Sequence, residues 1–230
     1  MKWEKYTTEV ELIEKQNDVE HDLYNIIANV IRDRAAFNDV SVRDIGNRRR
    51  SKSKKEKVFW GLKGFPDFVF LDKEYQPVEN NVDRQYLYGV IEAKFVDKPL
   101  YTSIDDKRQL WGHLLWFKKV IYTNGIEWRF YSVEEEYVQK VLEEITIKLL
   151  KTSKSLNKLQ DDSYNKLAKK GIVYHEINDI LDSVCNNYSL DELTECKPFV
   201  LRTISADGKK MWNETEWKGL IKYLNEYTVR

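Results

Sequence analysis

The sequence predicts a mixed α/β fold in which an N-terminal helix is followed by three strands, a helix, two strands and a helical tail. Two observations support this prediction. Apolar residues recur at helical spacing near the start of the chain and again over residues 103–119. Residues 58–73 and 86–97 are instead rich in β-branched and aromatic residues that alternate with a period of two. A chain of 230 residues is long enough to bury such elements around a substantial core.

The first helical pattern covers about residues 7–36, where apolar residues recur every three or four positions. These residues are Leu12, Val19, Leu23, Ile26, Ile27 and Val30. The spacing fits one long helix or two abutting helices. Residues 37–46 (FNDVSVRDIG) then predict a turn and a short strand. The next segment, RRRSKSKKEK at 48–57, has seven basic residues and one acidic residue in ten positions, and this composition predicts a loop.

Strand patterns follow the basic run. Residues 58–64 (VFWGLKG), 65–73 (FPDFVFLDK) and 86–97 (YLYGVIEAKFVD) predict three strands with short connections, which is typical of an antiparallel meander. The helix predicted over residues 103–119 should begin at Ser103, because a serine followed by aspartates suits a helix N-terminus.

Two further strands are predicted at residues 120–125 (VIYTNG) and 126–133 (IEWRFYSV). The dipeptide Asn124-Gly125 between them is a strong signal for a tight hairpin turn. Residues 137–151 (YVQKVLEEITIKLLK) fit either a helix or a further strand pair, and the pattern does not decide between them.

Composition divides the chain into a core over residues 1–150 and a helical C-terminal extension over residues 151–230. The extension is polar and ends in an amphipathic helix at 213–227. Trp212 and Trp217 lie at this helix, where they could belong to the core, to a dimer surface or to a platform for base stacking. Of these three roles, we expect core packing.

Charge and cysteine content exclude several classes of protein. The 38 basic and 38 acidic residues balance, which argues against a general polyanion binder of the histone kind but allows separated charged patches. Cys185 and Cys196 show neither zinc-site nor disulfide-scaffold spacing, which favours a reducing cytoplasm. The N-terminus lacks the apolar segment of a signal peptide, and no run reaches the ~20 apolar residues that a membrane span needs. We therefore expect a cytoplasmic protein without membrane contact.

The segment GVIEAKF, residues 89–95, carries two opposite charges on a predicted strand. Side chains at i and i+2 of a strand point to the same face, so Glu92 and Lys94 should lie side by side with Val90. The alternate residues should face a core, and they are Ile91, Ala93 and Phe95.

A second carboxylate, Asp67, stands at the head of the preceding strand, after Pro66. If the two strands pair, Asp67 and Glu92 can meet on one face of the sheet. Two adjacent carboxylates repel each other unless a cation neutralises them, and Mg²⁺ suits such a pair because it binds oxygen ligands and keeps waters for a substrate. Lys94 would then reach a water or a phosphate oxygen and assist deprotonation of the attacking water. These groups together would suit hydrolysis of a phosphodiester.

The alternative is an ion pair between Glu92 and Lys94 on a solvated face, which would contribute roughly 0–1 kcal/mol. An isolated Glu-x-Lys in a strand favours that alternative. The Pro66-Asp67 pair upstream, at this spacing and on a neighbouring strand, favours the catalytic interpretation.

These motifs resemble those of a known family. GFPDFVF (64–70) followed by GVIEAKF (89–95) resembles the PD-(D/E)XK nuclease superfamily. The downstream segments QLWGHLLWF (109–117) and VIYTNGIEWRFY (120–131) resemble the nuclease domain of type I restriction motor subunits and related solitary endonucleases. The resemblance covers about residues 10–133. It implies a restriction endonuclease-like mixed β-sheet flanked by helices, with an α-β-β-β-α-β core, to which the helical C-terminal extension is added.

The resemblance also implies roles for single residues. Asp67 and Glu92 would be metal ligands, Lys94 the catalytic lysine, and Gln109 the glutamine that such nucleases carry on the following helix. The family often has a tyrosine four residues after that glutamine, where this chain has His113. A lone histidine beside tryptophans is more often a packed or surface residue than a metal or acid–base group.

Glu20 matches a glutamate with which the family often completes its metal site from the first helix. It lies on the apolar stripe of that helix, where a carboxylate needs a partner. An equally good interpretation is a capping box, Asn17-x-x-Glu20.

The leading hypothesis from the sequence is therefore a Mg²⁺-dependent deoxyribonuclease, with Mn²⁺ as a substitute metal, acting in restriction or defence against foreign DNA. The basic run before the predicted meander would contact DNA phosphates without sequence preference. Its residues are Arg48, Arg49, Arg50, Lys52, Lys54, Lys55 and Lys57. Two alternatives are a catalytically silent nuclease-like module that binds nucleic acid or a protein partner, and a structural interaction protein. The sequence leaves open whether the enzyme forms a homodimer to cut both strands.

Overall fold

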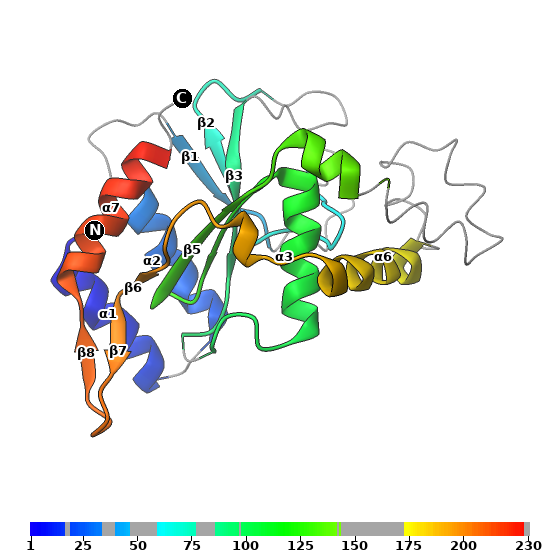
Figure 1. Ribbon diagram of the computed structural model, residues 1–230. Helices are drawn as coiled ribbons and strands as arrows, with labels where there is room; N and C mark the ends of the chain where they lie inside the picture. The colour runs from blue at the N-terminus through cyan, green and yellow to red at the C-terminus, as the bar shows by residue number, and fades with distance from the viewer. Residues whose placement is uncertain are drawn as a thin grey trace.

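A six-stranded mixed sheet lies at the centre of the protein, with helices on both faces (Figure 1). The computed structural model describes residues 1–16, 19–33, 40–46, 59–76, 86–96, 98–141, 143 and 173–227. The strands follow one another in space as they do in the chain. They are β1 (Val40–Asp44), β2 (Phe68–Asp72), β3 (Leu87–Ala93), β4 (Lys119–Thr123), β5 (Glu127–Ser132) and β6 (Phe199–Val200). Every neighbouring pair is antiparallel except β3 and β4, which are parallel.

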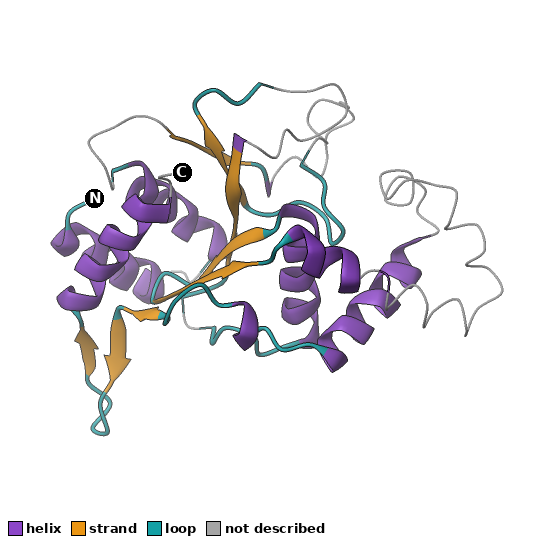
Figure 2. Ribbon diagram, turned by 45° about the horizontal axis from the view of Figure 1, so that its top comes forward, coloured by secondary structure: helices purple, strands orange, loops and turns teal. Residues whose placement is uncertain are grey.

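Helices cover the two faces of this sheet in separate groups (Figures 1 and 2). One group consists of α1 (Trp3–Gln16), α2 (Glu20–Arg32) and α7 (Glu214–Tyr227), and the other of α3 (Ile104–Phe117) and α6 (Val173–Asn187). Each group packs on its own buried hydrophobic cluster. The parallel connection from β3 to β4 passes through α3, as parallel strands require.

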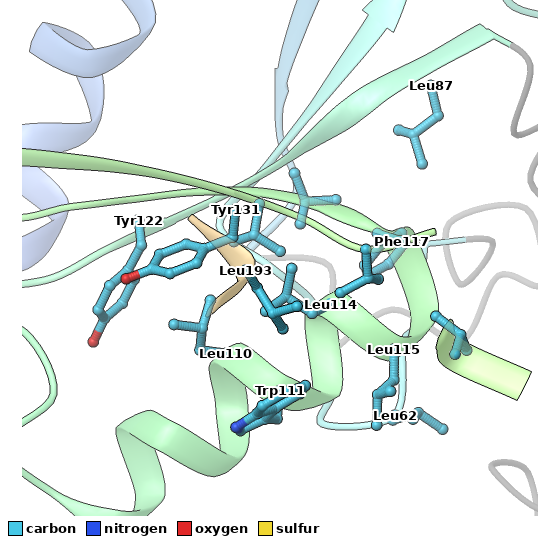
Figure 3. Packing of buried hydrophobic residues seen from close by; sticks show 14 of the residues in the cluster. Leu62, Leu87, Leu110, Trp111, Leu114, Leu115, Phe117, Tyr122, Tyr131 and Leu193 are labelled. Atoms are coloured by element: carbon cyan, nitrogen blue, oxygen red, sulfur yellow. The ribbon is translucent and has the colours of Figure 1, made fainter. Parts of the chain in front are cut away.

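Strand β3 separates the two clusters, and all seven of its residues are buried. Val90 packs with Trp111 and Leu114 of α3, whereas Ile91 and Ala93 pack with the α1, α2 and α7 group. Figure 3 shows the α3 side of this core, where Leu110 and Leu114 face Tyr131. A strand covered on both faces leaves no place for a solvated charge, so the charged residues near its end must be satisfied within the protein.

The structure confirms several sequence predictions. The first helical pattern forms two helices, α1 and α2, and Ser103 is the N-cap of α3, where its side chain accepts a hydrogen bond from the Asp106 amide. The turn at Asn124-Gly125 joins β4 to β5, with Gly125 at φ 80°. In the ambiguous segment after residue 134, residues 135–141 are helical.

The meander prediction was right in the antiparallel pairing of its second and third strands and wrong in its first strand and in the short connections between strands. The antiparallel meander consists of β1, β2 and β3, so its first strand is Val40–Asp44 and not residues 58–64. In the latter segment Gly61 and Gly64 exchange backbone hydrogen bonds across a turn, and Gly64 has φ 99°. Phe59 and Leu62 nevertheless pack into the α3 cluster, which explains why this segment is apolar.

The expectation that Phe95 faces the core is also wrong, because this side chain is 41% exposed. β3 ends at Ala93, and the Lys94 amide donates to the carbonyl of Thr123 as the chain leaves the sheet. The alternation of faces therefore stops before Phe95.

The described part of the C-terminal extension, residues 173–227, is mixed rather than helical. It adds β6 to the sheet and forms a hairpin of β7 (Arg202–Ile204) and β8 (Lys210–Trp212). The hairpin is tied to α1 by an ion pair between Arg202 and Glu14 at 2.7 Å. Trp217 of α7 is buried in the core, as expected. In the part of the chain that the structure describes, no helix is both long and apolar enough to cross a membrane.

Candidate active site

Asp67 and Glu92 meet where β2 begins and β3 ends. The antiparallel register pairs Phe68 with Ile91, so one further step sets Asp67 opposite Glu92. The Asp67 amide donates to the Ile91 carbonyl at 3.1 Å, which extends the ladder by that step. Pro66 has no amide hydrogen and cannot extend the ladder further. The sequence prediction that these two strands pair is confirmed, and the pairing sets the two acidic residues at opposed positions.

Two donors fix the carboxylate of Asp67, which is 4% exposed. The Ala93 amide donates to Oδ2 at 2.8 Å, and the hydroxyl of Tyr24 from α2 donates to Oδ1. The backbone of Asp67 is held as well, because the amides of Ile45 and Gly46 donate to its carbonyl at 2.9 and 3.2 Å. Tyr24 was not predicted from the sequence, although its place four residues after Glu20 puts both on one helix face.

Glu92 is 1% exposed and lies between two nitrogen atoms. Lys94 Nζ is 2.7 Å from Glu92 Oε1, and His113 Nε2 is 3.2 Å from Glu92 Oε2. Lys94 also donates to Gln109 Oε1 at 3.0 Å. The structure therefore brings together Asp67, Glu92, Lys94 and Gln109, all of which the sequence singled out. The pair of Glu92 and Lys94 is buried, which excludes the alternative of an ion pair on a solvated face.

Burial and mutual charge set the protonation of this cluster. Burial and the nearby charge of Glu92 raise the pKa of Asp67 well above its usual range. Burial alone would raise the pKa of Glu92 too, but the charge of Lys94 and the contact with His113 lower it. Burial opposes the charge on Lys94, yet its carboxylate partner raises the pKa of the ammonium group. Glu92 and Lys94 are thus an ionised pair, and Asp67 holds its proton more tightly than an exposed aspartate.

Glu20 is the first residue of α2 and lies within electrostatic reach of the cluster. Burial raises the pKa of its carboxyl, the charges of Lys94 and Lys98 lower it, and that of Glu92 raises it. The N-cap of α2 is Val19, without a side-chain hydrogen bond, so the described structure does not show the capping box. Asn17, its other member, lies outside the described residues.

The donor set fits Mg²⁺ with two carboxylate ligands. Among the described residues, no group of three or more histidine, cysteine, aspartate or glutamate side chains is arranged to hold a metal ion. Mg²⁺ usually binds through one or two carboxylates and takes its other ligands from waters and substrate phosphates. Asp67 and Glu92, which are buried at opposed positions of the two strands, match that smaller requirement, and Glu20 does not complete a cluster of three.

The basic run at 48–57 lies outside the described residues, but both of its described flanks lie near Asp67. On one side, the Gly46 amide donates to the Asp67 carbonyl. On the other, the ring of Trp60 packs on Phe65, two residues before Asp67, with 5.2 Å between ring centroids.

Comparisons with protein-family models, with curated proteins and with solved structures found no match for this chain.

Proposed function

We propose that this protein is a metal-dependent endonuclease that hydrolyses phosphodiester bonds in DNA. The observation that carries the proposal is the buried cluster of Asp67, Glu92, Lys94 and Gln109 at the junction of β2 and β3. The element order α2-β1-β2-β3-α3-β4 also supports it, because this is the α-β-β-β-α-β order of restriction endonuclease-like cores. Restriction or defence against foreign DNA is the biological role that fits this class.

Each residue of the cluster would have its own role in such a reaction. Asp67 and Glu92 would hold Mg²⁺, which when bound supplies Lewis-acid stabilisation of phosphate charge and acidifies water. Lys94 Nζ is 2.7 Å from Glu92 Oε1, and the charge of this carboxylate raises the pKa of the lysine against the effect of burial. We therefore assign it the task of stabilising negative charge on the phosphate and orienting the attacking water. Gln109, which accepts a hydrogen bond from Lys94 Nζ, keeps this ammonium group in place.

Affinity for DNA would come from the basic run between β1 and β2. Seven cations in ten positions can contact phosphates without reading sequence, and such contacts weaken as salt increases. The described chain leaves for this segment at Gly46 and returns at Phe59, and both ends lie in the neighbourhood of Asp67. With both ends there, the basic run would bind the phosphate backbone of DNA close to the carboxylates.

A plasmid-nicking assay with Mg²⁺ or Mn²⁺ tests the proposal. We expect the wild-type protein to nick supercoiled DNA and the variants Asp67→Ala and Lys94→Ala to lose that activity. Asp207→Ala is a suitable control, because Asp207 is an exposed residue of the β7–β8 turn. Equal cutting by wild type, Asp67→Ala and Lys94→Ala would disprove the assignment.

A second candidate is a nuclease-like module that binds nucleic acid without cutting it. One observation favours it: every carboxylate oxygen of Asp67 and Glu92 already has a hydrogen-bond partner within the protein. A cation would have to share or displace these partners. Salt-sensitive DNA binding with no cleavage under any divalent metal would support this second function.

A further inference from the structure

His113 lies inside the cluster rather than on the surface of α3. Its side chain is fully buried, and its Nε2 atom is 3.2 Å from Glu92 Oε2. Around it α3 presents apolar residues, including Phe117, whose ring centroid is 6.0 Å away. A buried polar ring among such residues needs a hydrogen-bond partner, and Glu92 provides it.

The geometry of strand and helix explains why two residues of α3 reach two residues at the end of β3. Glu92 and Lys94 are two residues apart on an extended chain, which spans roughly 6.6 Å at 3.3 Å per residue. Gln109 and His113 are four residues apart on a helix, which spans roughly 6.0 Å at 1.5 Å per residue. Because α3 runs back against β3 before the parallel strand β4, the earlier helix residue meets the later strand residue. Gln109 accordingly contacts Lys94, and His113 contacts Glu92.

The second ring nitrogen identifies the tautomer of His113. Nδ1 is buried and has no hydrogen-bond partner among the described residues. A proton on Nδ1 would be left without an acceptor, whereas a proton on Nε2 points to an ionised carboxylate. We assign the hydrogen-bonding proton to Nε2, so that His113 donates and Glu92 accepts.

We propose that His113 is a positioning residue that holds Glu92 in the orientation needed to bind a divalent cation. Lys94 donates to one carboxylate oxygen and His113 to the other, which opposes rotation of the carboxylate plane. Each oxygen keeps a second lone pair, so a cation could share it with the donor. The proposal rests on the proposed function, because Glu92 is a ligand only if the protein binds a metal. Partners that orient a metal ligand typically account for 10- to 100-fold in metal affinity or activity.

Two amide variants separate this role from simple packing. A glutamine amide can reach the position of Nε2, whereas an asparagine amide reaches only the position of Nδ1. We expect His113→Asn to weaken Mn²⁺ binding to the DNA-free protein, measured by calorimetry, by about 10- to 100-fold. His113→Gln should recover most of that loss, and nicking rates should follow the same order. Thermal unfolding of both variants shows whether each is folded.

Several outcomes would overturn the proposal. If folded His113→Asn binds Mn²⁺ as tightly as the wild type does, His113 has no positioning role. The same conclusion follows if His113→Gln and His113→Asn lose Mn²⁺ affinity to the same extent. Long-range ¹H–¹⁵N NMR spectra of the wild-type protein test the hydrogen bond without any metal, with His113→Gln assigning the signal. A His113 ring that carries a proton on Nδ1 alone would contradict the hydrogen bond from Nε2 to Glu92. A wild-type protein that neither binds Mn²⁺ nor nicks DNA would instead overturn the proposed function, and with it the ligand role of Glu92.

Discussion

Replacing Lys94 with methionine should destabilise the protein far more than replacing an exposed lysine. Lys94 is 6% exposed, and its ammonium group is 2.7 Å from a Glu92 carboxylate that is also buried. In Lys94→Met, Glu92 keeps its charge and its burial but loses its ionic partner, and only the contact with His113 remains. A buried charge left in this state is strongly unfavourable.

The magnitude follows from the distance. At an effective dielectric constant of about 20, two unit charges 2.7 Å apart attract by roughly 6 kcal/mol. Removing Lys94 also removes the cost of burying its own charge, which offsets part of that loss. Measured cases of one partner removed from a buried pair lie at about 3–5 kcal/mol, and we expect a value in this range. The double variant Glu92→Gln/Lys94→Met should lie within about 1 kcal/mol of wild type, because it leaves no buried charge unpaired.

Guanidinium chloride unfolding at pH 7, followed by tryptophan fluorescence, measures these differences. Lys218→Met is a matched control, because Lys218 also pairs with a carboxylate, that of Glu214, at 2.7 Å, but both side chains are largely exposed. An exposed pair on a helix contributes about 0.3–0.5 kcal/mol, so this variant should unfold almost as the wild type does. If Lys94→Met and Lys218→Met unfold at the same denaturant concentration, the argument that Glu92 and Lys94 form a buried ionic pair is refuted.

Two further predictions concern this cluster, and a third concerns the basic run at 48–57. Burial and the charge of Glu92 raise the pKa of Asp67, so the stability that its carboxyl contributes is complete below its unfolded pKa of about 3.9 and is lost as pH rises through the folded value. The thermal midpoint of Asp67→Asn, relative to that of wild type, should therefore increase from pH 4 to pH 8. A difference that stays constant with pH would contradict the raised pKa. Tyr24→Phe removes a donor to the Asp67 carboxylate and should lower the free energy of unfolding by about 0.5–1.5 kcal/mol in denaturant titrations, whereas no change would show that this bond contributes nothing. Replacing Arg48, Arg49 and Arg50 with glutamine should weaken the salt dependence of binding to duplex DNA. At roughly 0.9 per phosphate contact, the slope of log affinity against log salt concentration should decrease in magnitude by up to about 2.7. An unchanged slope in fluorescence anisotropy titrations would exclude these residues from the DNA interface.

Sequence patterns predicted the parts of the fold that depend on local periodicity. The alternation in GVIEAKF and the proline before Asp67 were enough to place two carboxylates on neighbouring strands, and the structure confirms that pairing. Periodicity failed at residues 58–64, because turn residues that pack against α3 are as apolar as strand residues. It failed again at Phe95, because the alternation holds only as far as the strand extends.

The parts of the site that depend on how separate elements pack could not be predicted in this way. Tyr24 reaches Asp67 because α2 packs on the sheet face that contains Phe68, and nothing within either segment specifies that contact. The contact of His113 with Glu92 depends in the same manner on the packing of α3. Four residues along a helix and two residues along a strand span nearly the same distance, so the spacing of Gln109 and His113 matches that of Lys94 and Glu92. Sequence reasoning can use this match only once the helix and the strand are known to run in opposite directions.

The site is therefore held from both faces of the sheet. On one face, Tyr24 of α2 fixes Asp67; on the other, Gln109 and His113 of α3 fix Lys94 and Glu92. Buried ionic groups rarely add net stability compared with apolar residues of the same volume. A double variant as stable as wild type would show that stability alone does not require this pair. The charges and their supporting residues would then need another explanation, and the chemistry proposed for Asp67, Glu92 and Lys94 supplies one.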